Sequence, residues 1–173
     1  MIEVFLVMKK KIRISPEELT TNYNVAYYKS PIGLLEIQID QKKLRSLKFQ
    51  EVKRYQEEKT PLLLEVKKQL NEYFKGMRKE FELPLKLVGT DFQKKVWKQL
   101  KEIPYGDTFS YKEVAESISN DKAYRAVGNA NNRNRIPIVI PCHRVIASNG
   151  KLGGYGGGVW RKKWLLQHEK DNL

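Results

Sequence analysis

Cysteine and histidine are scarce in this sequence of 173 residues, which contains one cysteine and two histidines. A single cysteine cannot form an internal disulfide, and so few thiol and imidazole groups exclude a structural zinc site, so we expect no bound metal. An intracellular, reducing location, the cytoplasm, follows as an expectation. The sequence also lacks an apolar run of membrane-spanning length, so we expect no membrane partner.

Acidic residues are outnumbered by basic ones: 33 Lys and Arg stand against 20 Asp and Glu, a formal net charge of +13 at pH 7. An excess of this size favours a polyanionic partner, of which nucleic acid is the commonest. Enrichment in lysine for solubility or heat tolerance is the alternative interpretation. Charge therefore indicates a class of partner, but no sequence or lesion preference.

The first half, residues 1–85, is predicted to be a small α+β domain in which no motif carries chemistry. In residues 1–14 the apolar part precedes the lysines and no small-residue cleavage site follows, so we interpret this stretch as a strand rather than a signal peptide. A helix is expected to begin at Thr60-Pro61, a capping residue followed by proline. Turn residues separate the strands expected in an antiparallel meander, Asn24–Tyr28, Leu34–Ile39 and Leu44–Phe49.

The second half, residues 86–173, is predicted to be a mostly helical, winged helix-turn-helix domain. Capping-box patterns begin two helices, one at Thr90 and one at Ser110. A third helix, from about Lys122 to Asn131, follows a short polar turn, as in a helix-turn-helix. A hairpin with its turn at Asn149-Gly150 would add the wing.

The third helix has a face of small residues beside one long cation, Arg125. Small side chains would let the helix approach a narrow DNA groove closely, and an arginine could fill a gap in a base stack. The same residues would equally suit packing against another helix, so this segment alone leaves both interpretations open. The small residues are Ala123, Ala126, Gly128 and Ala130.

The only cysteine, Cys142, is followed directly by His143 at the end of an apolar run. This run, Ile136–Ile140, is expected to be a buried strand or extended segment, although Pro137 and Pro141 prevent regular pairing. A thiol held rigidly beside an imidazole is a candidate activated nucleophile. For the dipeptide on its own, a buried structural cysteine beside an exposed histidine is the simpler interpretation.

A glycine-rich loop, Gly153–Gly158, and a C-terminal helix follow the cysteine. The loop lacks the Lys-Ser/Thr pair of a phosphate-binding loop, so we expect its backbone amides to approach a flat ligand beside Tyr155. Glu169, near the end of the helix, could reach a histidine only if the fold brought this helix back over Cys142. Otherwise Glu169 is an ordinary charge at a helix end.

Taken together, residues 89–169 resemble the O6-alkylguanine-DNA alkyltransferases, also called methylated-DNA–protein-cysteine methyltransferases. The matching blocks occur in the family's order, and the IPCHRV core is highly specific. The first half matches only in its coarse strand-then-helix pattern. The blocks are GTDFQKKVWKQLKEIPYGDTFSY, YRAVGNANNRN, IPIVIPCHRVIASNGKLGGYGGG and KKWLLQHE.

The resemblance implies a DNA repair protein that flips O6-alkylguanine, mainly O6-methylguanine, out of double-stranded DNA and transfers the alkyl group irreversibly to Cys142. His143 would act as a base through a water molecule, and Glu169 would orient His143. Because the thioether product is stable, the resemblance implies a single turnover without a cofactor. We also expect the protein to be monomeric.

The family's substrate-binding roles fall on residues around the cysteine. Tyr111 would donate a proton or a hydrogen bond to N3 of the guanine, and amides near Tyr155 and Gly156 would contact O6. The carbonyls of Cys142 and Val145 would accept hydrogen bonds from the exocyclic amine of the base.

On the DNA side, the resemblance implies that the recognition helix enters the minor groove without reading sequence. Arg125 would fill the space left by the flipped nucleotide, since the methyl group is unreachable inside a stacked duplex. Lysines and helix N-termini would contact phosphates, so affinity should fall with salt. The remaining DNA-binding residues would be Ala126, Gly128, Ala130 and Arg135.

Two features depart from the family pattern. Asn134, which would hold the turn before the cysteine segment, is followed by Arg135 where the family usually has proline, so the turn loses a rigid residue and gains a positive charge near the DNA. The zinc ligands of some members' N-terminal domains are also missing. A non-catalytic branch carries tryptophan at the nucleophile position, whereas this chain has Cys142.

Two other functions are compatible with these residues. A non-catalytic winged-helix lesion sensor or regulator would bind DNA and leave its thiol unmodified. A cysteine hydrolase using Cys142 and His143 would turn over an ester or amide, but the sequence offers no hydrolase framework around the pair.

Overall fold

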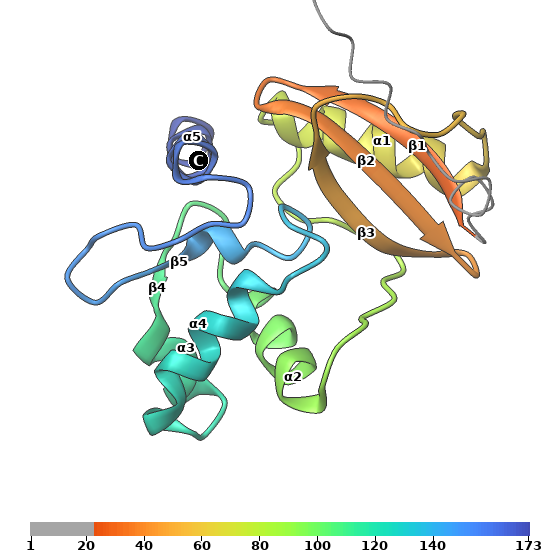
Figure 1. The fold of residues 1–173 in the computed structure, drawn as a ribbon. Coiled ribbons are helices and arrows are strands. Elements are labelled where there is room, and N and C mark those ends of the chain that lie inside the picture. The colour runs from red at the N-terminus through yellow and green to blue at the C-terminus, as the bar shows by residue number, and fades with distance from the viewer. Residues whose placement is uncertain (1–22) are drawn as a thin grey trace, which may run out of the picture.

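The computed structural model describes residues 23–173, so the strand expected within residues 1–14 lies outside the described part. The described chain begins with an antiparallel sheet in the order β1-β2-β3 (Figure 1). Ser30 pairs with Gly33 at the first turn, and Asp40 pairs with Lys43 at the second. The predicted meander is therefore confirmed. Its strands are β1 (Asn24–Ser30), β2 (Gly33–Asp40) and β3 (Lys43–Gln50).

Helix α1 (Pro61–Phe74) packs against β1 and β2. It begins where predicted, because the Thr60 side chain accepts a hydrogen bond from the amide of Leu63. Pro61 suits the first helical position, since it has no N–H that would be left without an acceptor. Gly76, just past the helix end, has φ +72°, which glycine adopts without the clash of a Cβ atom. The helix buries Leu63, Val66, Gln69, Leu70 and Tyr73.

The second half contains the predicted helices. Both capping boxes are present, at Thr90 before α2 (Asp91–Leu100) and at Ser110 before α3 (Tyr111–Ser117). The third helix is preceded by a 3₁₀ turn, η2 (Asp121–Ala123), so that α4 (Tyr124–Asn132) begins slightly later than expected. Helices α2, α3 and α4 pack against one another, with α3 and α4 as the helix-turn-helix pair.

The expected wing is only partly formed. A tight turn is present at Asn149-Gly150, closed by a 2.8 Å hydrogen bond from the Ala147 amide to the Lys151 carbonyl. No strand follows this turn within residues 23–173. Instead, β5 (Val145–Ile146) pairs in parallel with β4 (Phe109–Ser110). The carbonyls of Leu152 and Gly154 accept hydrogen bonds from the Lys162 ammonium, which ties this stretch to α5 instead of to a strand partner.

The apolar run before the cysteine is buried, as expected, but it is a compact turn rather than a strand. The Ile140 amide donates to the Ile136 carbonyl at 2.9 Å, and Ile138 has φ +75°, which is rare for a β-branched residue. Pro137 has no N–H with which to pair, which favours the turn over a ladder. The turn delivers the chain into a short 3₁₀ helix, η3 (Cys142–Arg144).

Helix α5 (Val159–Asp171) returns to pack against η3. Figure 1 shows α5 nearly end-on, with the sheet and α1 to one side and α2, α3 and α4 below. One apolar core runs through both halves and includes Leu35 and Leu70 as well as Val127 and Leu165. Within residues 23–173, no helix combines the length and apolar character needed to cross a membrane.

Candidate active site

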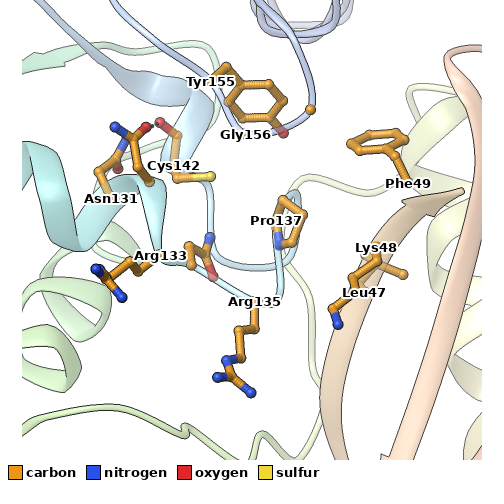
Figure 2. A pocket seen from close by; sticks show the side chains of 13 residues that line it. Leu47, Lys48, Phe49, Asn131, Arg133, Arg135, Pro137, Cys142, Tyr155 and Gly156 are labelled. Atoms are coloured by element: carbon orange, nitrogen blue, oxygen red, sulfur yellow. Dashed lines mark hydrogen bonds between the residues drawn. The ribbon is translucent and has the colours of Figure 1, made fainter.

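Cys142 lies at the first position of η3, with its side chain only 4% exposed. Its sulfur faces a cavity of about 340 Å³ between the C-terminal half and strand β3 (Figure 2). Tyr155 and Gly156 line the cavity, as does Phe49 on the opposite side. The other lining residues are Leu47, Lys48, Asn131, Asn132, Arg133, Asn134, Arg135, Pro137 and Gly157.

Asn134 ties together the turn that presents the cysteine. Its side-chain oxygen accepts a hydrogen bond from the Ile136 amide at 2.9 Å, and its amide group donates to the Ile140 carbonyl at 2.9 Å. Both ends of the apolar run are thereby fixed to one side chain. Arg135, whose side chain is exposed, occupies the next position, and its carbonyl accepts a 2.8 Å hydrogen bond from the Leu47 amide of β3.

Helix α5 does return to η3, the segment that carries the cysteine, and the Glu169 side chain of α5 is completely buried. One carboxylate oxygen, Oε1, lies 2.7 Å from Nε2 of His143 and accepts from the Tyr73 hydroxyl at 2.8 Å. Arg144 donates to both oxygens, through Nη2 to Oε1 at 3.1 Å and through Nε to Oε2 at 2.9 Å. The Gly106 amide completes the set by donating to Oε2 at 3.1 Å.

Burial and charge together set the protonation states of this cluster. Burial raises the pKa of Glu169, but the charge and hydrogen bonds of His143 and Arg144 outweigh it and hold that pKa well below its usual range. Burial lowers the pKa of His143, although Glu169 opposes this effect. The imidazole is therefore neutral at neutral pH and donates from Nε2 to the carboxylate. This assignment leaves Nδ1 as an acceptor.

The Nδ1 atom of His143 is buried and has no hydrogen-bond partner in the described part of the chain. A buried polar atom without a partner costs free energy unless a water or ligand satisfies it. Burial raises the pKa of the neighbouring Cys142 thiol to about 11, although Asn134, Lys162 and Tyr155 each lower it. The resting thiol is thus protonated, and it would need a proton acceptor to form a thiolate at neutral pH.

Lys162 is a buried cation that the sequence patterns did not reveal. Its ammonium donates to the Val145 carbonyl at 2.6 Å and to the carbonyls of Leu152 and Gly154. Burial lowers its pKa to about 8, against a raising effect of Cys142. These bonds fix the loop that runs from β5 to Tyr155.

The two carbonyls predicted to read a guanine amine already have donors. Val145 accepts from Lys162 at 2.6 Å, and Cys142 accepts from the side-chain amide of Asn131 at 3.2 Å. Each carbonyl oxygen has a second lone pair, so a further hydrogen bond is possible at each. Tyr111 does not line the main cavity; its ring lies 6.0 Å from Nζ of Lys162, and burial raises its pKa.

The small face of α4 divides between the two interpretations left open by the sequence. Arg125 and Ala126 are exposed, and Gly128 is half-buried. Ala130, in contrast, is only 2% exposed, and its carbonyl accepts a 2.8 Å hydrogen bond from the Trp97 indole of α2. At Ala130 the small residue therefore serves helix packing, and its contact with DNA stays a prediction.

Comparison with known proteins agrees with this geometry. A family model described as "6-O-methylguanine DNA methyltransferase, DNA binding domain" matches residues 91–171, and one described as "6-O-methylguanine DNA methyltransferase, ribonuclease-like domain" matches residues 24–87. The chain belongs to this family. As a 6-O-methylguanine DNA methyltransferase family member it is a DNA repair alkyltransferase, and the membership extends to the first half, where the sequence showed only a coarse pattern.

Curated relatives and solved structures agree. A methylated-DNA–protein-cysteine methyltransferase of Methanosarcina barkeri is 50% identical over 150 residues, covering 83% of this chain and 95% of the relative. A constitutive one from Bacillus subtilis is 50% identical over 120 residues, covering 69% and 73%. The Mycobacterium tuberculosis O6-methylguanine methyltransferase structure has a TM-score of 0.79 at 42% identity, covering 87% and 94%. The structure of Mycobacterium tuberculosis OGT in complex with DNA has a TM-score of 0.79 at 44% identity, covering 88% of this chain and 95% of that one.

Several residues of this family site escaped sequence reasoning. Tyr73 comes from a helix in which no motif indicated chemistry, and Arg144 was seen only as part of the IPCHRV core. Both contact Glu169, which lies 96 and 25 residues away along the chain, so no local pattern links them to it.

Within residues 23–173 no cluster of three or more His, Cys, Asp or Glu side chains could hold a metal ion.

Proposed function

We propose that this family member transfers the alkyl group of O6-alkylguanine in double-stranded DNA to Sγ of its own Cys142, once per molecule. One observation carries the proposal: a buried thiol faces a 340 Å³ cavity and is followed in the chain by an imidazole hydrogen-bonded to a buried carboxylate. The 6-O-methylguanine description of the matching family models supports guanine as the substrate base.

The proposed reaction is an in-line displacement at the alkyl carbon. The Cys142 proton passes through a water molecule to Nδ1 of His143, the S–C bond forms, and the C–O6 bond breaks with its electron pair moving onto the guanine. Glu169 stabilises the imidazolium that results, as in other base–orienter pairs. A thiol with a pKa raised to about 11 requires this coupling, because little thiolate exists at neutral pH without it.

The negative charge that develops on the leaving guanine must also be neutralised. We assign this role to Tyr111, which would donate to N3, and to backbone amides near Tyr155 and Gly156, which would contact O6. The products are an unmodified guanine, which remains in the DNA, and a thioether on Cys142. Thioethers are not hydrolysed at neutral pH, so the protein acts stoichiometrically and the scheme uses no cofactor.

On the DNA side, we propose that α4 enters the minor groove with Arg125, Ala126 and Gly128 facing the duplex. Arg125 would occupy the gap left by the flipped nucleotide. Its exposed position on α4 and the basic composition of the chain support this role. Arg135, exposed at the rim of the cavity, would add a phosphate contact.

Three further expectations belong to the proposal. We infer a cytoplasmic, monomeric protein, in line with its single free cysteine. We also infer two domains, residues 1–85 and 86–173, in keeping with the segment around Leu85, which leads from α1 to α2 and forms only one isolated bridge, with Leu44 of β3.

The experiment that tests the function is intact-protein mass spectrometry after incubation with duplex DNA carrying one O6-methylguanine. We expect a gain of one methyl group, mapped to the peptide containing Cys142, and no gain in Cys142→Ala, which should still bind the DNA. Lesion-dependent binding without any mass gain would overturn the transfer reaction and indicate a non-catalytic sensor.

A further inference from the structure

Tyr73 connects the N-terminal half of the molecule to the proposed relay. It lies in α1, its side chain is 0% exposed, and its hydroxyl donates to Oε1 of Glu169 at 2.8 Å. Its main-chain carbonyl accepts a 2.8 Å hydrogen bond from Nε2 of His168. One residue of α1 thus holds two consecutive residues of α5.

The phenol ring is fixed by aromatic packing on several sides. Its centroid lies 5.3–6.1 Å from the centroids of the Phe74, Phe81, Tyr105 and His168 rings. Beyond it, Gly76 lies so close to the Asn172 side chain of α5 that a Cβ atom at this position would overlap it. Helices α1 and α5 therefore meet closely here, and the Tyr73 hydroxyl has little freedom to leave Glu169.

We propose that Tyr73 is a positioning residue for alkyl transfer, which it serves by fixing the Glu169 carboxylate that orients His143. The proposal rests on the proposed function. It gives the N-terminal half a part in the chemistry, since the hydroxyl shares Oε1 with Nε2 of His143. The relay therefore extends from Cys142 through His143 and Glu169 to a helix 96 residues away from that carboxylate.

The hydrogen bond also adjusts the basicity of the relay. A donor to Oε1 draws negative charge from the oxygen that faces the imidazole, and so limits how strongly Glu169 stabilises protonated His143. Removing only the hydroxyl should concentrate charge on Oε1, which raises the pKa of His143. His143 must be neutral to accept the thiol proton. With a higher pKa it would stay protonated up to a higher pH, so the acidic range in which transfer fails would extend upward.

Other charged and titratable groups face this cluster, and each stays in place when the hydroxyl is removed. Arg144 donates to both carboxylate oxygens, and its guanidinium lies 5.6 Å from the centroid of the Tyr105 ring. The groups that face Tyr73, His143 or Glu169 are Arg144 of η3, Lys162 and His168 of α5, Tyr105, and Tyr155 of the glycine-rich loop.

The decisive variant is Tyr73→Phe, which removes one oxygen and keeps the ring. Tyr27→Phe is a matched control: Tyr27 is also buried in the N-terminal half, and its hydroxyl lies 3.3 Å from the Glu36 carboxylate and accepts from the amides of Arg54 and Tyr55. Within residues 23–173, the Tyr27 hydroxyl and ring interact with Glu36, Lys53, Arg54 and Tyr55, and not with Cys142, His143 or Glu169. Both variants lose a buried hydroxyl, so both should lose some thermal stability.

We would measure the first-order rate of methyl transfer at saturating lesion DNA from pH 5 to 9, with DNA affinity measured separately. For Tyr73→Phe we expect about a tenfold slower transfer at pH 7, with DNA affinity unchanged. The acidic limb of the pH–rate profile, where the rate falls as His143 becomes protonated, should move upward by roughly half a pH unit. Tyr27→Phe should keep the wild-type limb and rate.

The outcomes separate cleanly. A wild-type rate and limb in Tyr73→Phe, or a slower rate with an unmoved limb, would overturn the positioning role. Failure of the wild-type protein to accept any methyl group would instead overturn the proposed function itself. A melting temperature lowered equally in both variants, with a shifted limb only in Tyr73→Phe, is the result that supports the proposal.

Discussion

Glu169 shows how one carboxylate can remain ionised in a site that disfavours charge. It is fully buried, yet Tyr73, Gly106, His143 and Arg144 all donate to it. From the sequence, Glu169 could be either a relay residue or an ordinary charge at a helix end. The choice depends on partners 25 to 96 residues away, and only the folded chain brings them together.

Replacing Glu169 by glutamine keeps the shape of the side chain and removes its charge. The buried guanidinium of Arg144 would then lack its counter-ion, and the Nε2–H of His143 would lose its charged acceptor. We expect the free energy of unfolding to fall by about 3–5 kcal/mol. Methyl transfer should also slow, since nothing would stabilise the imidazolium. Urea denaturation at pH 7 and timed mass spectra measure the two effects.

The same carboxylate predicts how stability depends on pH. Because the folded state holds the pKa of Glu169 well below its usual range, its contribution is complete above the unfolded pKa of about 4.3 and is lost as pH falls further. We therefore expect the wild-type protein to lose stability more steeply below about pH 4 than Glu169→Gln. Parallel acid-denaturation curves for the two proteins would contradict the ionised assignment.

At the scale of elements, local sequence patterns predicted where helices begin and where turns lie better than they predicted which segments pair as strands. Thr60, Thr90 and Ser110 begin their helices as the capping patterns indicated, because these hydrogen bonds are made within four residues. The burial of the Ile136–Ile140 run and the turn at Asn149-Gly150 were predicted, but the turn form of the run and the missing second strand of the wing were not. Asn134 folds the run into a turn, and the hydrogen bond from Lys162 to the Leu152 carbonyl ties the stretch after Asn149-Gly150 to α5.

The turn before Cys142 should be sensitive to one side chain. Asn134→Ala would leave the Ile136 amide and the Ile140 carbonyl without their partner and release a turn in which Ile138 holds φ +75°. We expect a loss of about 2 kcal/mol in unfolding free energy and slower methyl transfer. Denaturation curves and timed mass spectra provide the check.

Asn129→Ala is the matched control for that experiment. Asn129 lies on the preceding helix with an exposed side chain, so its loss should change stability by less than about 0.5 kcal/mol. If Asn134→Ala proved as stable and as fast as this control, the turn would be held by the prolines and the apolar burial alone.

At the scale of the whole molecule, a few long-range bonds join the two halves around the cavity. The Leu47 amide donates to the Arg135 carbonyl, and Arg161 donates through Nε to the Ile32 carbonyl. Its guanidinium also lies 4.4 Å from the centroid of the Phe49 ring. The sequence predicted the two halves separately. It could not predict that β3 forms one wall of the thiol cavity, since that depends on how the halves meet.

The basic charge of the molecule and the exposed Arg125 together predict a difference between duplex and free-base substrates. Flipping a nucleotide is needed only in a duplex, and phosphate contacts exist only with DNA. We expect Arg125→Ala to slow transfer from duplex O6-methylguanine by about tenfold at saturating DNA, and to leave transfer from the free base unchanged. Timed mass spectra with each substrate measure the ratio.

Lys122→Ala separates charge from flipping, because Lys122 is an exposed cation three residues before Arg125. We expect it to weaken DNA binding and to reduce the slope of log affinity against log salt by about 1, with the saturated duplex rate preserved. Transfer from free O6-methylguanine should be insensitive to salt in all three proteins, because that substrate carries no phosphate. Equal losses on both substrates in Arg125→Ala would instead mean that Arg125 supports the fold of α4 rather than the extrusion of the base.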